Sequence, residues 1–329
     1  MTQFTMRLMA TLAMPLLCAP GMLCAQSILE VRAEDSNGQF DFWVPFARRP
    51  DDEYTNGARL SVLFAGAPFW GHPCSAARAG DARGAAACTT TELAIGQDIY
   101  TPANAFDSPF PAPGERPYAG WLYSSATAQR NTTTASDGVT TDLGVTGPPS
   151  LAEHIQNTVH RVFGFSPTLG WAHQIPTQLG ARLAYQHDQQ IVRVIVGSVP
   201  VFTVTPYATG SVGNVLTGAT AGVEGRAGYG VTAPWSAAIP GRARKVEIYA
   251  LSGIREDWIL HEMVLDEPTV DPSFAVAKIP WVTQYEVGGG VRWWAFEAEY
   301  RVFRRGREYT TGPAGRTYGE LSAGVRTAP

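Results

Sequence analysis

The stretch WAFEAEYRVF, at residues 294–303, carries the clearest structural signal in the chain. Apolar and charged residues alternate along it, which is the pattern of a β-strand with one apolar and one polar face. The apolar face holds Trp294, Phe296, Ala298, Tyr300 and Val302, and the polar face holds Glu297, Glu299 and Arg301. A strand of this kind separates an apolar environment from a polar one.

Similar strands recur along the chain. The stretch RKVEIYA, at residues 244–250, alternates in the same way, with Val246, Ile248 and Ala250 on one face. We expect about twelve strands, an even number that suits a closed antiparallel barrel. They lie near residues 27–35, 54–65, 91–100, 117–129, 139–146, 177–191, 199–212, 217–230, 243–255, 281–291, 293–304 and 316–326.

The predicted strands favour a transmembrane β-barrel over a soluble β-sandwich, although a sandwich would alternate too. They are about 10 residues long, as a tilted membrane-spanning strand requires. Their polar faces carry charges, which a water-filled lumen accommodates. Aromatic residues gather near strand ends, as at a membrane interface: Trp121, Tyr123, Trp281, Trp293 and Trp294. A soluble exported sandwich stays the alternative, and extraction from a membrane fraction without detergent would identify it.

The N-terminus has the features of a secretory signal peptide. Arg7 precedes an apolar run from Leu8 to Leu17, and small residues precede an expected cleavage site after Ala25. The apolar run is too short to span a membrane as a helix. We therefore expect residues 1–25 to be removed and residues 26–329 to form a single barrel domain.

Export also bears on two of the cysteines. Cys74 and Cys88 bracket a loop of small residues. Two cysteines in an oxidising compartment favour a disulfide. A metal site there would need more ligands than His72 supplies.

Composition excludes two classes of protein. The aromatic content of 11% and hydrophobic content of 45% are too high for a disordered chain. The net charge of −4 argues against nucleic acid as a partner.

One segment departs from the strand pattern. GPPSLAEHIQNTVHRVFG, residues 147–164, predicts a short helix in an outer-side loop, and Ser150 followed by Glu153 has the spacing of a capping box. Gln156 and His160 lie one turn apart on a polar face and can point at one spot. The opposite face is apolar and holds Ile155, Val159, Val162 and Phe163. The plain alternative is an amphipathic helix that plugs the lumen with its polar face wet.

Polar motifs gather at one rim of the predicted barrel. With the N-terminus in the periplasm, odd-numbered strands end at the outer rim and even-numbered strands begin there. Asp35 ends the first strand, Thr55 begins the second, Arg116 precedes the fourth, and the helix with His160 follows the fifth. A carboxylate, a hydroxyl, a guanidinium and an imidazole on one rim indicate a functional site.

Four motifs in this order resemble the outer-membrane lipid A 3'-O-deacylases. They are YTNG, GQDIYTP, GERPYAGWLY and DLGVTGPPSLAEHIQNTVHRVFG, and the resemblance is strongest over residues 30–175. The family implies a twelve-stranded barrel in the outer membrane of a Gram-negative bacterium, with a calcium-dependent esterase site near the outer leaflet. Lipid A, as part of lipopolysaccharide, would be the substrate, and we expect the protein to act as a monomer.

The resemblance assigns roles to individual residues. His160 resembles the general base that activates water, and Gln156 resembles its close partner in the site. Asp35 matches the acidic site residue after the first strand, and Thr55 matches the hydroxyl residue at the start of the second. Arg116 matches the arginine that opens the fourth strand, and its guanidinium could pair with a lipid A phosphate.

Three departures from the family pattern bear on the calcium ion (Ca2+). Glu34 stands where the family can have asparagine, and together with Asp35 it could hold the ion. Residues 105–107, AFD, stand where a basic residue is expected. Ser166 stands near the place of an expected acidic residue, whose loss would weaken the metal site.

We therefore expect a calcium-dependent esterase in which His160 activates the water that hydrolyses the 3'-linked acyl ester of lipid A. Two other interpretations stay open: a barrel that binds lipid A without cleaving it, and a channel-forming barrel. A serine-type outer-membrane phospholipase has less support. The chain has no G-x-S-x-G motif, and Ser124 and Ser125 have no evident histidine partner.

Overall fold

The structure is a computed structural model. It describes residues 27–42, 53–67, 69–74, 87–239, 244–266 and 276–327. The predicted signal peptide, residues 1–25, lies outside the described residues.

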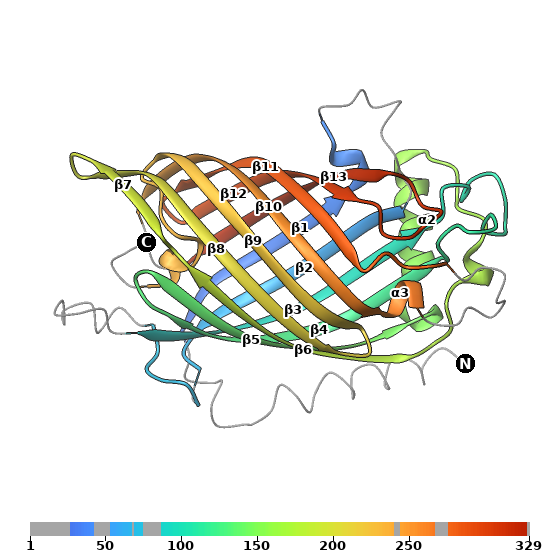
Figure 1. Ribbon diagram of the computed structural model, residues 1–329, viewed down its shortest axis with the longest axis horizontal. Helices are drawn as coiled ribbons and strands as arrows, with labels where there is room; N and C mark the ends of the chain where they lie inside the picture. Colours follow the sequence, from blue (N-terminus) through green and yellow to red (C-terminus); the bar gives the residue numbers. More distant parts are fainter. Residues whose placement is uncertain are drawn as a thin grey trace.

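Antiparallel strands make up most of the described chain (Figure 1). The strands are β1 (Ile28–Asn37), β2 (Glu53–Ala65), β3 (Cys88–Thr101), β4 (Ala119–Asn131), β5 (Ala135–Thr146), β6 (Leu179–Gln189), β7 (Val192–Val196), β8 (Val199–Gly213), β9 (Leu216–Tyr229), β10 (Val246–Glu262), β11 (Trp281–Trp293), β12 (Phe296–Gly306) and β13 (Gly315–Arg326). The helical segments are η1 (Gly38–Phe40), η4 (Pro148–Ser150), α2 (Ala152–Phe163), η5 (Trp171–His173), η6 (Pro234–Ala238) and α3 (Met263–Asp266). No helix within the described ranges is long and apolar enough to cross a membrane.

These strands close into a barrel. Strands that follow one another in the chain pair side by side, and β1 pairs with β13, for example Val31 with Val325. β6 pairs with β8, because β7 is a short extension of the β6 strand beyond a break at Gln190 and Ile191. The described residues thus form a barrel of twelve strands, as predicted. β6 corresponds to the expected strand at 177–191, and β7 extends beyond its expected end.

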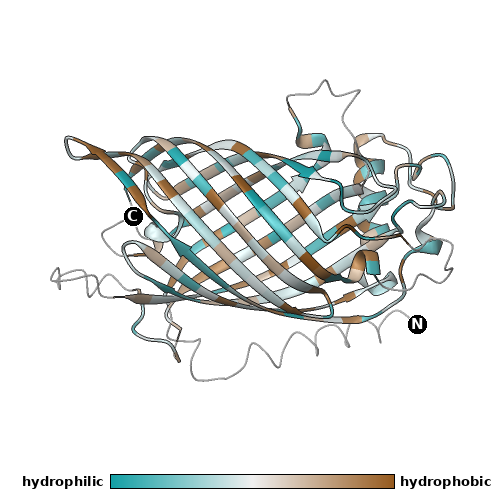
Figure 2. Cartoon of the chain, viewed as in Figure 1, coloured by the Kyte–Doolittle hydropathy of each residue, from teal (hydrophilic) through white to brown (hydrophobic). Residues whose placement is uncertain are grey.

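The two faces of the barrel wall differ, because hydrophobic and hydrophilic residues alternate along the strands (Figure 2). In the lumen, Arg301 Nη1 of β12 lies 2.8 Å from Glu224 Oε2 of β9 and 2.9 Å from Glu286 Oε2 of β11. The outer face carries exposed apolar side chains such as Leu60, Ile95, Leu183, Ile254 and Phe296. This arrangement suits lipid outside and charged groups inside. Trp294 departs from the predicted strand, since it lies in the β11–β12 turn with φ of 57°.

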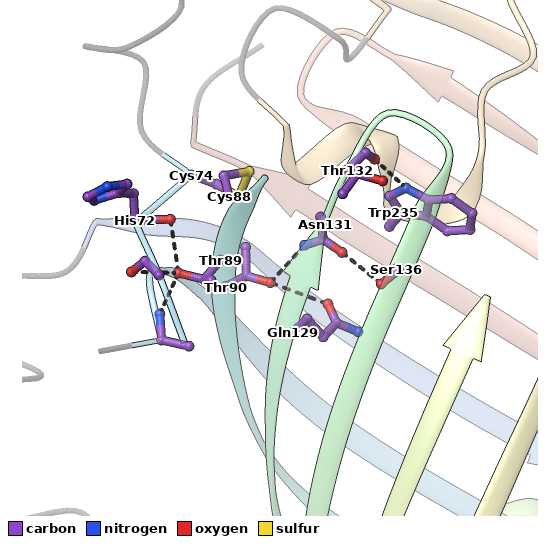
Figure 3. The surroundings of a disulfide bond; sticks show 12 residues. His72, Cys74, Cys88, Thr89, Thr90, Gln129, Asn131, Thr132, Ser136 and Trp235 are labelled. Carbon is purple, nitrogen blue, oxygen red and sulfur yellow. Dashed lines mark hydrogen bonds between the residues drawn. A yellow bond between two sulfur atoms is a disulfide. The ribbon is translucent and has the colours of Figure 1, made fainter. Parts of the chain in front are cut away.

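The disulfide predicted between Cys74 and Cys88 is present (Figure 3). Cys88 begins β3, whereas the far end of β3 lies near α2. Near the disulfide, Trp235 Nε1 of η6 donates a 2.9 Å hydrogen bond to the Thr132 carbonyl oxygen. The disulfide therefore braces the end of the barrel that lies away from α2.

Candidate active site on the outer wall

Helix α2 lies at the end of the barrel opposite the start of β3, where Cys88 forms the disulfide (Figure 1). Gln97 Nε2 of β3 donates a 2.6 Å hydrogen bond to the carbonyl oxygen of Ser150, just before α2. On β4, a Cβ at Gly120 would lie 2.2 Å from Ser150 Oγ, so glycine leaves room for the chain. Glu92 of β3 and Gln129 of β4 line the lumen. Gln97 lies five residues from Glu92, and Gly120 lies nine residues from Gln129. Because successive residues of a strand point to opposite faces, Gln97 and Gly120 face outward. The helix therefore does not plug the lumen.

The start of α2 differs from the predicted capping box. Leu151 is the N-cap residue, with φ of 62°, and it makes no side-chain hydrogen bond to the helix. Ser150 Oγ instead donates a 2.6 Å hydrogen bond to the carbonyl oxygen of Gly147. The capping-box prediction is wrong, because the turn that precedes the helix already uses the Ser150 hydroxyl.

The polar face of α2 is buried and its apolar face is exposed. Gln156 and His160 are each 4% exposed, whereas Val162 and Phe163 are 73% and 69% exposed. A helix on a water-soluble protein turns its apolar stripe inward. The opposite arrangement suits a helix whose outer side meets lipid. Gln156 and His160 are therefore enclosed between the helix and its surroundings, and their face is not a wet surface.

His160 is held in one orientation. Its Nδ1 lies 2.8 Å from the carbonyl oxygen of Ser166, and Nδ1 carries the proton because a carbonyl only accepts. The rings of Phe106 and Phe165 pack against the imidazole, with centroid distances of 5.6 Å and 5.9 Å. In the neutral ring, Nε2 is then the nitrogen that can accept a proton. Phe106, in the segment where a basic residue was expected, thus supplies an aromatic contact to the histidine.

Gln156 lies one turn before His160 on the same buried face. Its Oε1 accepts hydrogen bonds from Trp171 Nε1 at 3.0 Å and from Thr168 Oγ1 at 3.2 Å. Its Nε2 is buried and has no hydrogen-bond partner in the part of the chain that the structure describes. Sequence analysis missed Trp171 and Thr168. Both residues lie within the span 30–175 over which the family resemblance is strongest, but nothing in the sequence linked them to the helix.

Asp35 lies on the same outer wall, two strands from Gln97. Glu34 lines the lumen, so Asp35 faces outward. Asp35 pairs with Ala58, and Ala58 pairs with Gln97. At the usual strand spacing, Asp35 is about 10 Å from Gln97, which holds the segment that begins α2. Asn56 Nδ2 donates a 2.7 Å hydrogen bond to Asp35 Oδ1.

Glu34 is separated from Asp35 by the barrel wall. Its Oε2 lies 3.3 Å from Arg59 Nη1 on the lumen side. Successive residues of a strand point to opposite faces, so two neighbouring carboxylates cannot converge on one ion. The expectation that Glu34 and Asp35 hold calcium together therefore does not hold in this structure.

Thr55 lies on the same side as Asp35. It occupies a β-bulge, because the register of β2 skips from Tyr54 to Asn56. Its Oγ1 is buried and lies 2.6 Å from Thr101 Oγ1. Thr101 shares the outer face with Gln97, four residues earlier in β3. The bulge thus turns the predicted hydroxyl toward the outer wall.

Arg116 is not presented to the outer wall. It is 0% exposed, and its Nη2 lies 3.6 Å from Glu308 Oε2. Its guanidinium lies 4.8 Å from the ring centroid of Tyr100. Tyr100 is on the lumen face of β3, because Gln97, three residues earlier in the same strand, faces outward. A buried guanidinium in this place cannot meet a lipid phosphate, so the predicted phosphate contact is not supported.

Arg116 instead belongs to a charge cluster around Glu308, in the loop between β12 and β13. Glu308 Oε1 accepts a 2.7 Å hydrogen bond from Arg305 Nε, and its Oε2 lies 3.0 Å from Arg316 Nη1. Burial raises the pKa of Glu308, but Arg316, Arg305 and Arg116 outweigh burial and lower the pKa to about 2. This cluster fixes the outer end of the barrel electrostatically.

Asp35 offers the charged oxygen for a metal ion on this wall. No group of three or more His, Cys, Asp and Glu side chains is suited to a metal within the described ranges. Calcium accepts roughly 6–8 oxygens and takes carbonyl, amide and water oxygens as well as carboxylates. Because Asn56 turns its amide nitrogen to Asp35, its amide oxygen is directed elsewhere. Asp35 can therefore supply one carboxylate ligand to an ion on this wall, and neutral oxygens would have to complete the coordination.

Comparisons with known proteins agree with this architecture. A family model described as outer membrane protein LpxR matches residues 8–327. The solved structure of LpxR from Salmonella typhimurium is similar, with a TM-score of 0.72 at 17% identity, over 90% of this chain and 99% of that chain. A search of curated proteins by sequence found no match.

Other outer-membrane barrels are far less similar. The translocator domain of the autotransporter NalP from Neisseria meningitidis has a TM-score of 0.38 at 9% identity, over 91% of this chain and 87% of that chain. The autotransporter AIDA-I transport unit from Escherichia coli has a TM-score of 0.35 at 10% identity, over 96% and 95% of the two chains. Similarity this low supports no comparison beyond a general one.

Proposed function

The chain belongs to the LpxR family of outer membrane proteins, and on that premise we propose that it is an esterase that removes the 3'-linked acyl group of lipid A. The observation that carries the proposal is the enclosed His160. Its Nδ1 is fixed on the Ser166 carbonyl, which makes Nε2 the proton acceptor. The helix that bears it turns an apolar face outward, so an ester would arrive from the lipid side.

In the proposed reaction, His160 acts as a general base. Its Nε2 takes a proton from water, and the water oxygen attacks the carbonyl carbon of the ester. The bond to the 3' oxygen of the glucosamine then breaks, and that oxygen recovers the proton from His160. The products are a free fatty acid and lipid A with a 3'-hydroxyl group.

We also propose that the reaction depends on calcium. Asp35 would be the charged ligand, with neutral oxygens and water around it. When bound, the ion would supply positive charge for the negative charge that develops on the carbonyl oxygen. Thr55 lies on the same side of the wall, and its place at a bulge keeps its hydroxyl near this region.

Mass spectrometry of lipid A from a Gram-negative host that expresses the protein tests the proposal. Loss of one 3'-linked acyl or acyloxyacyl group, abolished by chelation of calcium, is the expected result. Unchanged lipid A from protein that is folded in the outer membrane would contradict it and favour a barrel that binds lipid A without cleavage.

A serine nucleophile has less structural support. Ser124 lies on the outer wall, and its Oγ donates a 3.3 Å hydrogen bond to the carbonyl oxygen of Leu143. Activation of a serine needs a base within hydrogen-bond reach. In this structure the hydroxyl of Ser124 is engaged by the backbone of the neighbouring strand.

A further inference from the structure

The side-chain amide of Gln156 has a fixed orientation, and the residue that fixes it is Trp171. An indole N–H can only donate, so the group that faces it must be the amide oxygen. Trp171 Nε1 lies 3.0 Å from Gln156 Oε1 and 2.9 Å from Thr168 Oγ1, and the Thr168 hydroxyl donates to Gln156 Oε1 at 3.2 Å. Thr168 Oγ1 lies equally close, at 3.2 Å, to Asn157 Oδ1 and shares its one hydrogen between the two acceptors, so the Trp171 N–H is the donor that fixes the amide.

Trp171 is itself anchored to the barrel. It is 2% exposed and packs in a cluster with Ile99 of β3, Tyr118 and Ala152. The Tyr118 hydroxyl donates a 3.1 Å hydrogen bond to the Ala105 carbonyl oxygen and accepts one of 3.2 Å from the Gly170 N–H. The position of the indole is therefore set by the outer wall and not by α2 alone.

This orientation directs the amide NH2 of Gln156 away from its two partners. Gln156 Nε2 is buried, and within the described ranges it has no hydrogen-bond partner. A buried donor without a partner is unfavourable and is retained where a ligand supplies the acceptor. His160 lies one turn further along the same buried face, so the unused donor and the proposed base serve one region.

We propose that Trp171 is a positioning residue that, together with Thr168, presents the NH2 group of Gln156 as a hydrogen-bond donor to the carbonyl oxygen of the ester. This inference rests on the proposed function and assigns the group that recognises the reacting carbonyl. When water attacks, negative charge moves to that oxygen, and a donor fixed beforehand stabilises it most. The ester carbonyl would thereby complete the hydrogen bonding of the amide.

The test is a double-mutant cycle on purified protein that hydrolyses lipid A in detergent micelles with calcium chloride. Trp171→Phe keeps an aromatic ring and removes only the N–H. We expect kcat to fall about tenfold or more, as for the loss of a carbonyl-stabilising donor, with KM changed less than about twofold. In a Gln156→Leu background, Trp171→Phe should have no further effect on kcat.

A matched control is Trp235→Phe, which removes an indole hydrogen bond of 2.9 Å to a backbone carbonyl at the other end of the barrel. It should leave kcat unchanged. If Trp171→Phe does not fold, Thr168→Val removes the second donor to the same oxygen and is expected to lower kcat in the same coupled way.

The outcomes separate the two proposals. Two results would overturn the positioning role and leave the esterase intact. One is an unchanged kcat in Trp171→Phe. The other is that Trp171→Phe lowers kcat by the same factor in the wild-type protein and in Gln156→Leu. An inactive wild-type protein that is correctly folded would overturn the proposed function, and this inference would fall with it.

Discussion

His160 Nδ1 lies 2.8 Å from the main-chain carbonyl oxygen of Ser166, so the histidine is oriented by the backbone and not by a side chain. Ser166 stands near the place where the family resemblance led us to expect an acidic residue, and its side chain is exposed. The contact that fixes the tautomer is available to almost any residue at this position. A change of side chain there therefore need not disturb the base.

The first prediction separates His160 from Ser166. His160→Ala should lower the rate of lipid A hydrolysis by at least about 100-fold, because it removes the general base. Ser166→Ala should keep the rate within about twofold, because the carbonyl oxygen stays in place. Initial rates on purified lipid A measure both, with electrophoretic mobility before and after heating as the check of folding. A Ser166→Ala loss as large as that of His160→Ala would show that the serine side chain itself takes part.

The second prediction uses two neighbours on opposite faces of β1. Asp35→Asn should raise the calcium concentration for half-maximal activity by about tenfold or more, because it removes the charged ligand. Glu34→Gln changes a carboxylate on the lumen side, paired with Arg59, and should shift that concentration less than about twofold. Calcium titrations of the two variants give the comparison. Equal shifts in both would contradict the separation of the two carboxylates by the wall.

The third prediction concerns stability and pH. The pKa of Glu308 is about 2 in the folded protein, against roughly 4.3 in an unfolded chain. A lowered carboxyl pKa stabilises the fold above the unfolded value, and this contribution is lost as the pH falls toward the folded value. Glu308→Gln removes the carboxylate that Arg116, Arg305 and Arg316 share, although Arg305 keeps Asp257 as a second partner. It should reduce the free energy of unfolding by about 3 kcal/mol at pH 7.

Urea unfolding of the wild-type protein and of Glu308→Gln, followed by tryptophan fluorescence, measures the difference. It should stay constant near pH 7 and shrink as the pH falls from about 4 toward 2. Glu153→Gln, at an exposed position of α2, is the control and should leave stability unchanged. A difference that persists undiminished at low pH would rule out an ionised Glu308 as its source.

Much of the fold could be predicted because a barrel wall separates lipid from a charged interior. A strand in such a wall alternates between apolar and polar residues with a period of two. Glu299 and Arg301 on the lumen face of β12 follow this pattern, and so do charged residues of distant strands, such as Glu30 and Arg32. The break at Gln190 and Ile191 was not predictable, because it depends on hydrogen bonds to Thr134 and Val204 in other hairpins.

The site was predictable only in part. Helical spacing predicted the helix and placed Gln156 and His160 on one face. It did not predict that the polar face of the helix is buried and the apolar face exposed, because hydropathy does not say whether water or lipid surrounds a helix. Trp171 and Thr168 reach Gln156 through an irregular segment that has no period to interpret. The error over Glu34 came from treating neighbours in sequence as neighbours in space.

The fourth prediction addresses the channel interpretation. Inside the lumen, Arg301 of β12 contacts carboxylates of β9 and β11, and Arg305 Nε contacts Glu308 near the outer end. Inside, a cavity of about 320 Å³ is lined by charged side chains and by Trp235 of η6. Protein reconstituted in planar bilayers should therefore show no steady stepwise conductance. Long-lived ohmic openings in wild-type protein would favour a porin and count against a lumen closed by ion pairs.

The fifth prediction concerns the exposed side of α2. Val159 and Arg161 are both exposed, but at 100° per residue they lie about 200° apart around the helix. The variant Val159→Cys can carry a nitroxide spin label and be reconstituted in a bilayer. If the apolar face meets the outer leaflet, oxygen, which concentrates in lipid, should relax this label more than a water-soluble nickel chelate does. The same label at Arg161→Cys should show the reverse preference. Cys74 and Cys88 are joined in the disulfide, and Cys18 and Cys24 lie in the expected signal peptide. Each introduced cysteine can therefore be labelled alone in protein from which that peptide has been removed. Equal access of the nickel chelate to both sites would place the apolar face in water and remove the lateral route by which we expect the ester to reach His160.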